Sequence, residues 1–221
     1  MIKIAHIADI HFRALSRHDE YKKAFIEFAD DAKKNQVDYI FVGGDIFHTK
    51  TSGISPEYIE LLVWWLNTLA AVAPVHMILG NHDGNLSNSS RQDAVTPIIE
   101  ALNHKDIHLY KQSGIYEFHP GFMLCVYSIF DLPGWDKVVP TPGKTNIACY
   151  HGPVWGAKTE TGWDIEGDVD VAFFKQKGYD IVLLGDIHLR QYLDFKDTEI
   201  IVDEADLDKY PDAEVIEEID S

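Results

Sequence analysis

Short apolar runs of strand length alternate with helical periodicity through the first half of the chain. The runs at residues 2–8, 39–42 and 75–79 are continuous, as in strands that are buried on both faces. Between them, residues 21–32 and 56–72 carry apolar side chains every three or four positions, which predicts helices. This β-α-β-α-β order indicates a parallel sheet that is covered by helices.

The second half changes character after a third helix, which is expected over residues 91–102. Four strands joined by short turns are expected at residues 107–110, 115–118, 122–129 and 145–149. A short helix near 171–176 and a strand at 181–184 follow. With 46% apolar residues, a chain of 221 residues can fill the core of one domain.

The charge of the chain is strongly acidic and unevenly placed. The 36 acidic and 19 basic residues give a net charge of −17, which excludes a basic nucleic-acid-binding surface spread over the whole molecule. Residues 194–221 contain 12 acidic and 2 basic residues, a net −10, so the first 193 residues carry only −7. The acidic balance therefore does not exclude contact with nucleic acid through the first part of the chain.

The cysteines and the apolar runs bear on the cellular compartment. Cys125 and Cys149 both lie within apolar runs, so we expect buried free thiols rather than a disulfide framework. No signal peptide is visible at the start, and no apolar run approaches the roughly 18 to 20 residues that a membrane span needs. We expect a cytoplasmic protein with no membrane segment.

Side chains that can bind a metal follow five of the apolar runs. They are Asp9 and His11, Asp45 with His48, Asn81 with His82 and Asp83, His151, and Asp186 with His188. Ligand sites in open α/β sheets gather at the carboxyl ends of strands, where the loops converge. Each motif alone occurs by chance, but five of them in this order predict a metal site. The other six histidines lack such context and are interpreted as structural or surface residues.

This order of motifs resembles the calcineurin-like metallophosphoesterases, whose signature runs Asp-x-His, Gly-Asp, Gly-Asn-His-Asp/Glu, His and Gly-His-x-His. The matching motifs span residues 9–188. A narrower resemblance, to the SbcD-type nuclease subunits of double-strand-break repair complexes and to the bacteriophage recombination nuclease subunit, rests on residues 44–48 and 91–99. The resemblance implies a four-layer α-β-β-α sandwich with a two-metal site at the C-terminal ends of strands.

Carried over to the matching positions, the resemblance implies two divalent ions bridged by Asp45. The first site would be completed by Asp9, His11 and His188. The second site would be completed by Asn81, His151 and Asp186. Asp186 stands where the family usually has histidine, and this additional oxygen ligand favours Mn²⁺ or Mg²⁺ over zinc.

The resemblance also implies roles for three residues beside the metals. His82 would stabilise the phosphorane or protonate the leaving oxygen, and Asp83 would orient the His82 ring. His48 matches a histidine that positions the substrate in the nuclease branch of the family.

We therefore expect a metal-dependent phosphodiesterase, the DNA exonuclease or endonuclease subunit of a recombination-repair complex, with a catalytic domain over residues 1–200 and an acidic segment over 201–221. The nuclease subunits continue with a capping domain and a segment that binds an SbcC-like ATPase, so this sequence is expected to be a catalytic core. A stand-alone phosphatase or cyclic-nucleotide phosphodiesterase of the same superfamily is the alternative, which the acidic balance favours. A non-catalytic scaffold is a third reading, and the full ligand set argues against it.

Residues 56–72 carry a second apolar row beside the expected core stripe. The core stripe comprises Ile59, Leu62, Val63, Leu66 and Leu69. The second row comprises Leu61, Trp65, Thr68 and Val72, with Trp64 beside it. A helix with two apolar faces is either fully buried or part of an interface. Because the family pairs two protomers through the helices after the second and third motifs, we expect a homodimer through helices 56–72 and 91–102; the alternative is that the tryptophans cover the core.

Overall fold

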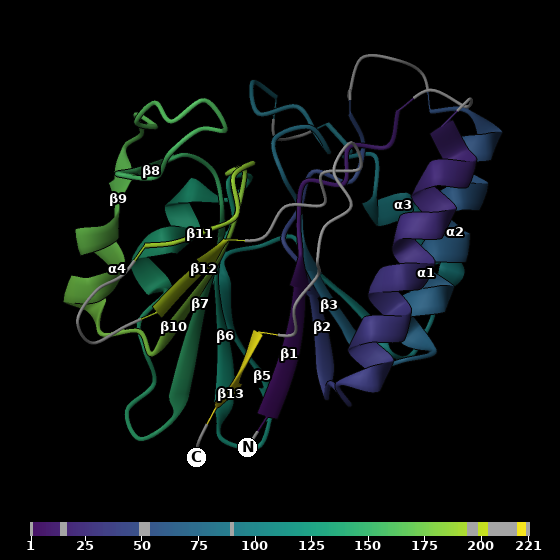
Figure 1. The fold of residues 1–221 in the computed structure, drawn as a ribbon. Helices are drawn as coiled ribbons and strands as arrows, with labels where there is room; N and C mark the ends of the chain where they lie inside the picture. Colours follow the sequence, from purple (N-terminus) through teal and green to yellow (C-terminus); the bar gives the residue numbers. More distant parts are fainter. Residues whose placement is uncertain are drawn as a thin grey trace.

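The computed structural model describes residues 2–13, 17–48, 54–88, 91–193, 199–202 and 216–219. Two β-sheets lie face to face, with helices on the outer side of each sheet (Figure 1). The strand order is β13-β1-β2-β3-β4 in the first sheet and β11-β12-β10-β7-β6-β5 in the second. The four-layer α-β-β-α sandwich is therefore confirmed.

The first sheet and its helices come mainly from the first half of the chain. Its parallel strands are β1 (Ile2–Ile7), β2 (Tyr39–Val42), β3 (Val75–Ile78) and β4 (Ile107–Tyr110). The edge strand β13 (Ile216–Ile219) pairs antiparallel with β1. The outer face is covered by α1 (His18–Lys34), α2 (Pro56–Ala70) and α3 (Thr96–Leu102) (Figure 1).

The second sheet comes from the second half of the chain. Its parallel strands are β6 (Phe122–Tyr127), β7 (Thr145–His151), β10 (Ile181–Gly185) and β12 (Glu199–Val202). The antiparallel edge strands are β5 (Gly114–His119) and β11 (Gln191–Tyr192). Outside this sheet lie α4 (Val171–Lys177), the 3₁₀ helix η2 (Leu132–Lys137) and the short pair β8 (Val154–Trp155) and β9 (Val169–Asp170).

Apolar side chains fill three separate layers. One core lies between the helices and the first sheet, one between the two sheets, and one outside the second sheet. Alternation along β6 places Leu124 between the sheets and Cys125 in the outer core, as expected for a strand that is covered on both faces. Cys125 and Cys149 are free and completely buried, which confirms the prediction of buried thiols.

The third helix is shorter than predicted. It begins at Thr96 rather than at residue 91. The Asp93 carboxylate accepts hydrogen bonds from the backbone N–H groups of Val95 and Thr96, at 3.0 and 2.6 Å, and from the Thr96 hydroxyl at 2.7 Å. These bonds satisfy the first free N–H groups of the helix and fix where it begins.

The prediction that Leu61 and Trp65 form an outer interface is wrong. Their exposed fractions are 2% and 0%, whereas Ile59, which was assigned to the core stripe, is 39% exposed. The Trp65 ring lies 4.9 Å from the Phe25 ring on α1 and 5.8 Å from the Phe12 ring. Because α2 packs against both the sheet and α1, two of its faces belong to the core. This row therefore gives no support to a homodimer.

The C-terminal residues contribute to both sheets. The boundary expected at residue 200 falls within β12, and Ile216–Ile219 forms β13 next to β1. Most of the acidic stretch, residues 203–215, lies outside the described residues. Within the described part of the chain, no helix combines the length and the apolar character that crossing a bilayer requires.

Candidate metal centre

The predicted ligands lie in the loops after β1, β2, β3 and β10, with His151 as the last residue of β7, and several have a strained backbone. Asp9, His11, Asp45 and Asp186 have φ values of 55°, 48°, 54° and 73°, in the left-handed region that L-residues rarely adopt. The other two non-glycine residues with positive φ in the described ranges, Gln36 and Asn103, follow helices. Backbone strain is therefore concentrated at the candidate site, as is typical of functional sites.

Main-chain hydrogen bonds join the loops of the first sheet. The Asp9 N–H donates to the Gly44 carbonyl oxygen at 3.1 Å, and the His11 N–H donates to the Asp45 carbonyl oxygen at 2.9 Å. The Asp45 carboxylate accepts the N–H of His82 at 2.8 Å. The loops after β1, β2 and β3 are thereby held as one unit.

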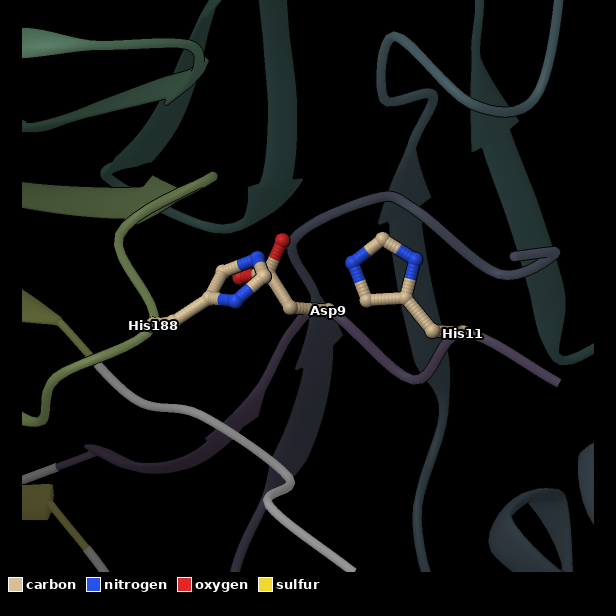
Figure 2. Close-up of side chains that lie close together, drawn as sticks. All are labelled: Asp9, His11 and His188. Carbon is tan, nitrogen blue, oxygen red and sulfur yellow. The ribbon is translucent and has the colours of Figure 1, made fainter. Parts of the chain in front are cut away.

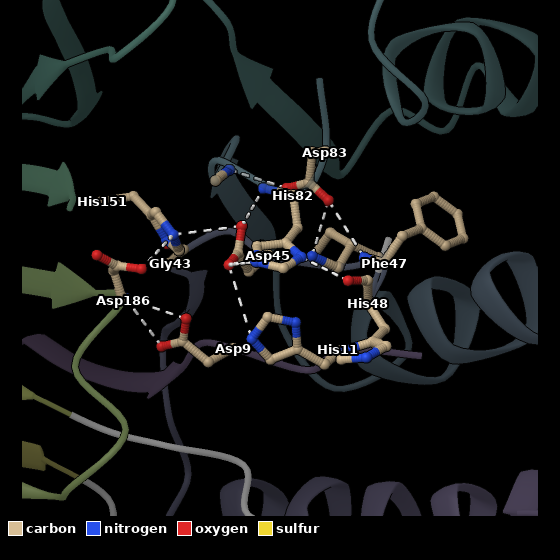
Figure 3. A network of polar contacts seen from close by, with 12 residues as sticks. Asp9, His11, Gly43, Asp45, Phe47, His48, His82, Asp83, His151 and Asp186 are labelled. Carbon is tan, nitrogen blue, oxygen red and sulfur yellow. Dashed lines mark hydrogen bonds and ion pairs between the residues drawn. The ribbon is translucent and has the colours of Figure 1, made fainter. Parts of the chain in front are cut away.

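Two further hydrogen bonds cross between the sheets. The backbone N–H of Asp186, after β10, lies 3.0 Å from both carboxylate oxygens of Asp9. The His151 Nδ1, at the end of β7, lies 2.7 Å from the Gly43 carbonyl oxygen and donates its proton to it. This bond leaves the His151 Nε2 facing Asp45, 3.3 Å from its Oδ1 (Figure 3).

Potential ligand atoms converge in three overlapping groups. They are Asp9 with His11 and His188 (Figure 2), His11 with Asp45 and His82, and Asp9 with Asp45 and His151. Within each group the ligand atoms lie within 4.8 Å of one another. Asp186 lies beside the third group, with its Oδ1 3.9 Å from the His151 Nε2. Asn81 follows β3 in the same loop as His82, and its Oδ1 is buried.

The donor atoms fit divalent cations. Both ring nitrogens of His11, the Oδ2 of Asp45 and the Nε2 of His151 are buried without a hydrogen-bond partner, which is costly unless a cation binds them. Glycines make room for this convergence. A Cβ atom on Gly80 would lie 2.1 Å from the Asp45 Oδ1, and one on Gly44 would lie 2.6 Å from the His151 Nδ1.

The pKa values of the site reflect burial and crowded carboxylates. Burial, together with Asp45 and Asp186, raises the pKa of Asp9 to about 8. Burial lowers the pKa of His11 to about 3. Burial alone would lower the pKa of His151, but the carboxylates, Asp45 above all, raise it to about 10. Three carboxylates gathered at one site, two of them buried, need positive charge beside them, which divalent cations supply.

The prediction that Asp83 orients the His82 ring is wrong. Its Oδ1 accepts the backbone N–H groups of Ile46 and Phe47 at 2.8 and 3.2 Å, and its Oδ2 accepts that of Gly80 at 2.8 Å. These bonds use both oxygens of a carboxylate that is 1% exposed. Asp83 thus holds the loop after β2 against the loop after β3.

The His82 ring is instead held by the main chain of His48. The His82 Nδ1 is hydrogen-bonded to the carbonyl oxygen of His48, and the His82 Nε2 lies 4.0 Å from the Asp45 Oδ2 (Figure 3). The His82 side chain is 40% exposed, so it can reach a substrate. Sequence reasoning missed this contact because a carbonyl acceptor is present at every residue. The His48 side chain is exposed at the edge of the site, and its ring is stacked with that of His82 at 6.1 Å.

The combination of a four-layer sandwich and a cluster of Asp and His ligands at the strand ends defines a metal-dependent phosphoesterase. Residues 2–190 match the family model described as calcineurin-like phosphoesterase, and the chain belongs to this family. The family implies divalent metal ions and the hydrolysis of phosphoesters.

Curated proteins that are similar in sequence include a viral protein and a DNA repair protein. The chain is 42% identical over 203 residues to an uncharacterised protein of Acanthamoeba polyphaga mimivirus, a match that covers 86% of this chain and 15% of that protein. It is 31% identical over 108 residues to the DNA double-strand break repair protein Mre11 of Archaeoglobus fulgidus, covering 46% of this chain and 23% of Mre11. The matches thus span less than a quarter of the length of either relative.

Solved structures that share the fold at low sequence identity include a hydrolase and a phosphatase. The phosphopantetheinyl hydrolase of Mycobacterium tuberculosis superposes with a TM-score of 0.54 at 10% identity, covering 97% of this chain and 95% of that one. A dimetal phosphatase from Danio rerio superposes with a TM-score of 0.53 at 11% identity, covering 91% and 86%.

Proposed function

We propose that this chain is a two-metal phosphodiesterase that hydrolyses DNA, the nuclease part of a recombination-repair protein. The observation that carries the hydrolytic part is the set of three overlapping ligand groups, two of which contain Asp45. The similarity to Mre11, a DNA double-strand break repair protein, supports DNA as the substrate.

Seven residues would hold two divalent ions. They are Asp9, His11, Asp45, Asn81, His151, Asp186 and His188. Asp45 would bridge the ions, because its two oxygens face different histidines, His151 at 3.3 Å and His11 at 3.6 Å. Two such ions supply positive charge to the scissile phosphate and activate a water molecule for attack. Three carboxylates among the ligands favour Mn²⁺, with Mg²⁺ as the alternative.

The residues around the ions orient the substrate and move a proton. With its Nδ1 bonded to the His48 carbonyl oxygen, the His82 ring presents Nε2 toward the site, where a proton can pass to the leaving oxygen. The exposed His48 side chain lies beside His82 and would position the DNA strand. Asp83 fixes the loops and does not touch the reacting groups.

A stand-alone phosphatase or cyclic-nucleotide phosphodiesterase is the second candidate, and the net charge of −17 favours it because small substrates need no basic surface. Under the nuclease proposal, the full-length protein would bind an SbcC-like ATPase. It would act in the cytoplasm, or in the cytoplasm of the host if a phage encodes it.

The two candidates differ in substrate. Labelled single- and double-stranded DNA, bis(p-nitrophenyl) phosphate and p-nitrophenyl phosphate are each incubated with the protein and MnCl₂, with Asp45→Asn as the matched inactive control. We expect manganese-dependent cleavage of DNA and of the diester, and little cleavage of the monoester. Rapid hydrolysis of the monoester with intact DNA would assign the chain to the phosphatases.

Thermal unfolding checks the metal site without turnover. A ligand that binds only the folded protein stabilises it by an amount that grows with its concentration. Added MnCl₂ should therefore raise the melting temperature of the wild type and shift that of Asp45→Asn far less. Equal shifts in the two proteins would mean that the ions bind elsewhere.

A further inference from the structure

Four large apolar side chains are exposed on the two segments that lead away from the candidate metal centre. They are Trp155 at 56%, Trp163 at 76%, Leu189 at 36% and Tyr192 at 52% exposure. Trp155 and Trp163 follow His151 along the chain, and Leu189 and Tyr192 follow His188. Exposed apolar side chains that lie together on a surface mark binding sites.

The two segments are joined by the side-chain amide of Gln191. Its Oε1 accepts the Lys158 N–H at 2.9 Å, and its Nε2 donates to the Lys158 carbonyl oxygen at 2.8 Å and to the Leu189 carbonyl oxygen at 3.1 Å. These three bonds hold the segment after His188 against the segment after His151. The two segments that carry the exposed rings are therefore in direct contact with each other.

Trp163 is displayed by an ordered turn. The Thr159 N–H donates to the Trp163 carbonyl oxygen at 2.8 Å, and the Trp163 N–H donates to the Thr159 hydroxyl at 3.1 Å. The base of the turn is anchored in the core, because Ala157 is completely buried and accepts the Ile165 N–H at 2.8 Å. The backbone that carries the ring is thus ordered before any ligand arrives, which lowers the entropic cost of binding.

The charges of this turn select against a phosphate group as its direct ligand. The Lys158 ammonium is paired with the Asp164 carboxylate at 2.5 Å, and Glu160 adds a further negative charge. An uncharged flat group therefore fits the exposed rings better than an anion does. Indole and phenol rings stack on nucleobases of any sequence, a contact worth about 1–3 kcal/mol per base.

We propose that Trp155, Trp163 and Tyr192 form an aromatic platform on which unpaired bases next to the scissile phosphate stack. The phosphate would lie at the metal centre, and the bases would lie on the adjacent platform. The inference rests on the proposed nuclease function and adds a substrate class, single-stranded or frayed ends. In blunt duplex DNA the bases are already stacked on one another and are not available to the platform.

Binding without turnover tests the platform directly. A fluorescently labelled thymidine oligonucleotide and an abasic chain of equal length, with the same phosphates but no bases, are titrated with the protein in EDTA. The wild type should bind the thymidine chain more tightly than the abasic chain. Trp163→Ala and Trp155→Ala should each weaken thymidine binding by about five- to a hundredfold and so narrow the difference between the two chains.

Ile26→Ala is the matched control, because Ile26 is 47% exposed on α1 and is remote in sequence from both segments. This variant should bind both chains as the wild type does. Unchanged discrimination between thymidine and abasic chains in the tryptophan variants would overturn the platform and leave the rings to a protein partner. An equal loss for both chains would overturn it as well.

The cleavage assay separates this outcome from failure of the proposed function. A wild-type protein that cleaves the thymidine oligonucleotide with Mn²⁺, while the tryptophan variants discriminate normally, retains the nuclease function without the platform. A wild-type protein that hydrolyses bis(p-nitrophenyl) phosphate but neither binds nor cleaves the oligonucleotide refutes both.

Discussion

Main-chain groups hold the side chains of the candidate metal centre. The Gly43 carbonyl oxygen fixes the tautomer of His151, the His48 carbonyl oxygen orients His82, and the Asp186 N–H restrains Asp9. The path of the backbone therefore sets the geometry of the site. This explains why the loops tolerate left-handed residues, since relaxing the strain would move the ligands.

Replacing His82 tests whether it acts on the substrate or on a metal. We expect His82→Ala to retain both metals and to lose turnover by about 10²- to 10⁴-fold, the typical effect of removing a general acid. Elemental analysis and hydrolysis of bis(p-nitrophenyl) phosphate measure the two quantities. His82 also lies in a group with His11 and Asp45 that could bind an ion, so the loss of one metal equivalent would identify it as a ligand.

His6 should make the stability of the fold sensitive to acid. It is completely buried, neither ring nitrogen has a hydrogen-bond partner, and burial lowers its pKa from 6.5 to about 3. Between these values the unfolded chain binds more protons than the folded chain. The contribution of neutral His6 is therefore complete above pH 6.5 and is lost as the pH falls toward 3.

Urea unfolding of the wild type and of His6→Leu at neutral and at moderately acidic pH measures this contribution. Two pH units below the unfolded pKa, the His6 contribution to the free energy of unfolding should fall by about 2–3 kcal/mol. The variant should lose correspondingly less stability than the wild type. An identical loss in both proteins would mean that His6 is not the group responsible.

At the scale of helices and strands, the ends of the strands could be predicted better than the surroundings of the helices. Strands β1, β2, β3 and β10 end close to where their apolar runs meet Gly or Asp, and this placed four of the five segments of the site; the fifth was placed by His151 at the end of the β7 run. The buried faces of α2 could not be predicted, because periodicity records that a side chain is apolar but not which neighbour covers it. Likewise, the start of α3 depends on how the Asp93 side chain folds back onto the backbone.

Trp65 should therefore be essential for stability rather than for association. Trp65→Ala should lower the free energy of unfolding by about 3–5 kcal/mol, the usual cost of removing a large buried ring. Urea denaturation measures the change, with the partly buried neighbour Trp64→Ala as the control. If Trp65→Ala remained as stable as the wild type and only changed the mass seen by light scattering, the ring would lie in an interface after all.

At the scale of the whole molecule, the four-layer arrangement was implied by the resemblance and not by the periodicity. The alternation of strands and helices in the first half predicts one covered parallel sheet. It carries no information about the packing of Ile4 and Phe41, in the first sheet, with Leu124 in the second sheet. The role of Asp83 was equally out of reach, since its partners are backbone groups whose positions exist only in the folded loops.

The acidic charge of the molecule sets its behaviour toward duplex DNA. Affinity for a duplex comes mainly from basic groups that neutralise phosphates, and in this chain 36 acidic residues outnumber the 19 basic ones. We expect weak action on blunt duplex that decreases steeply between about 50 and 200 mM salt. Binding and digestion at both salt concentrations measure this. Rapid duplex digestion at the higher concentration would reveal a basic surface in the folded protein.

The hydrogen bonds between Asp186 and Asp9 and between His151 and Gly43 have a consequence for how the molecule could be divided. Strands β1 to β4 come from the chain before residue 111, and β5 to β12 come from the chain after it. Neither half contains all the proposed ligands, so two separately produced fragments would recover tight binding of the cation only by reassembling the sandwich. Cation uptake would then report fragment complementation, and added cation would drive the two fragments together.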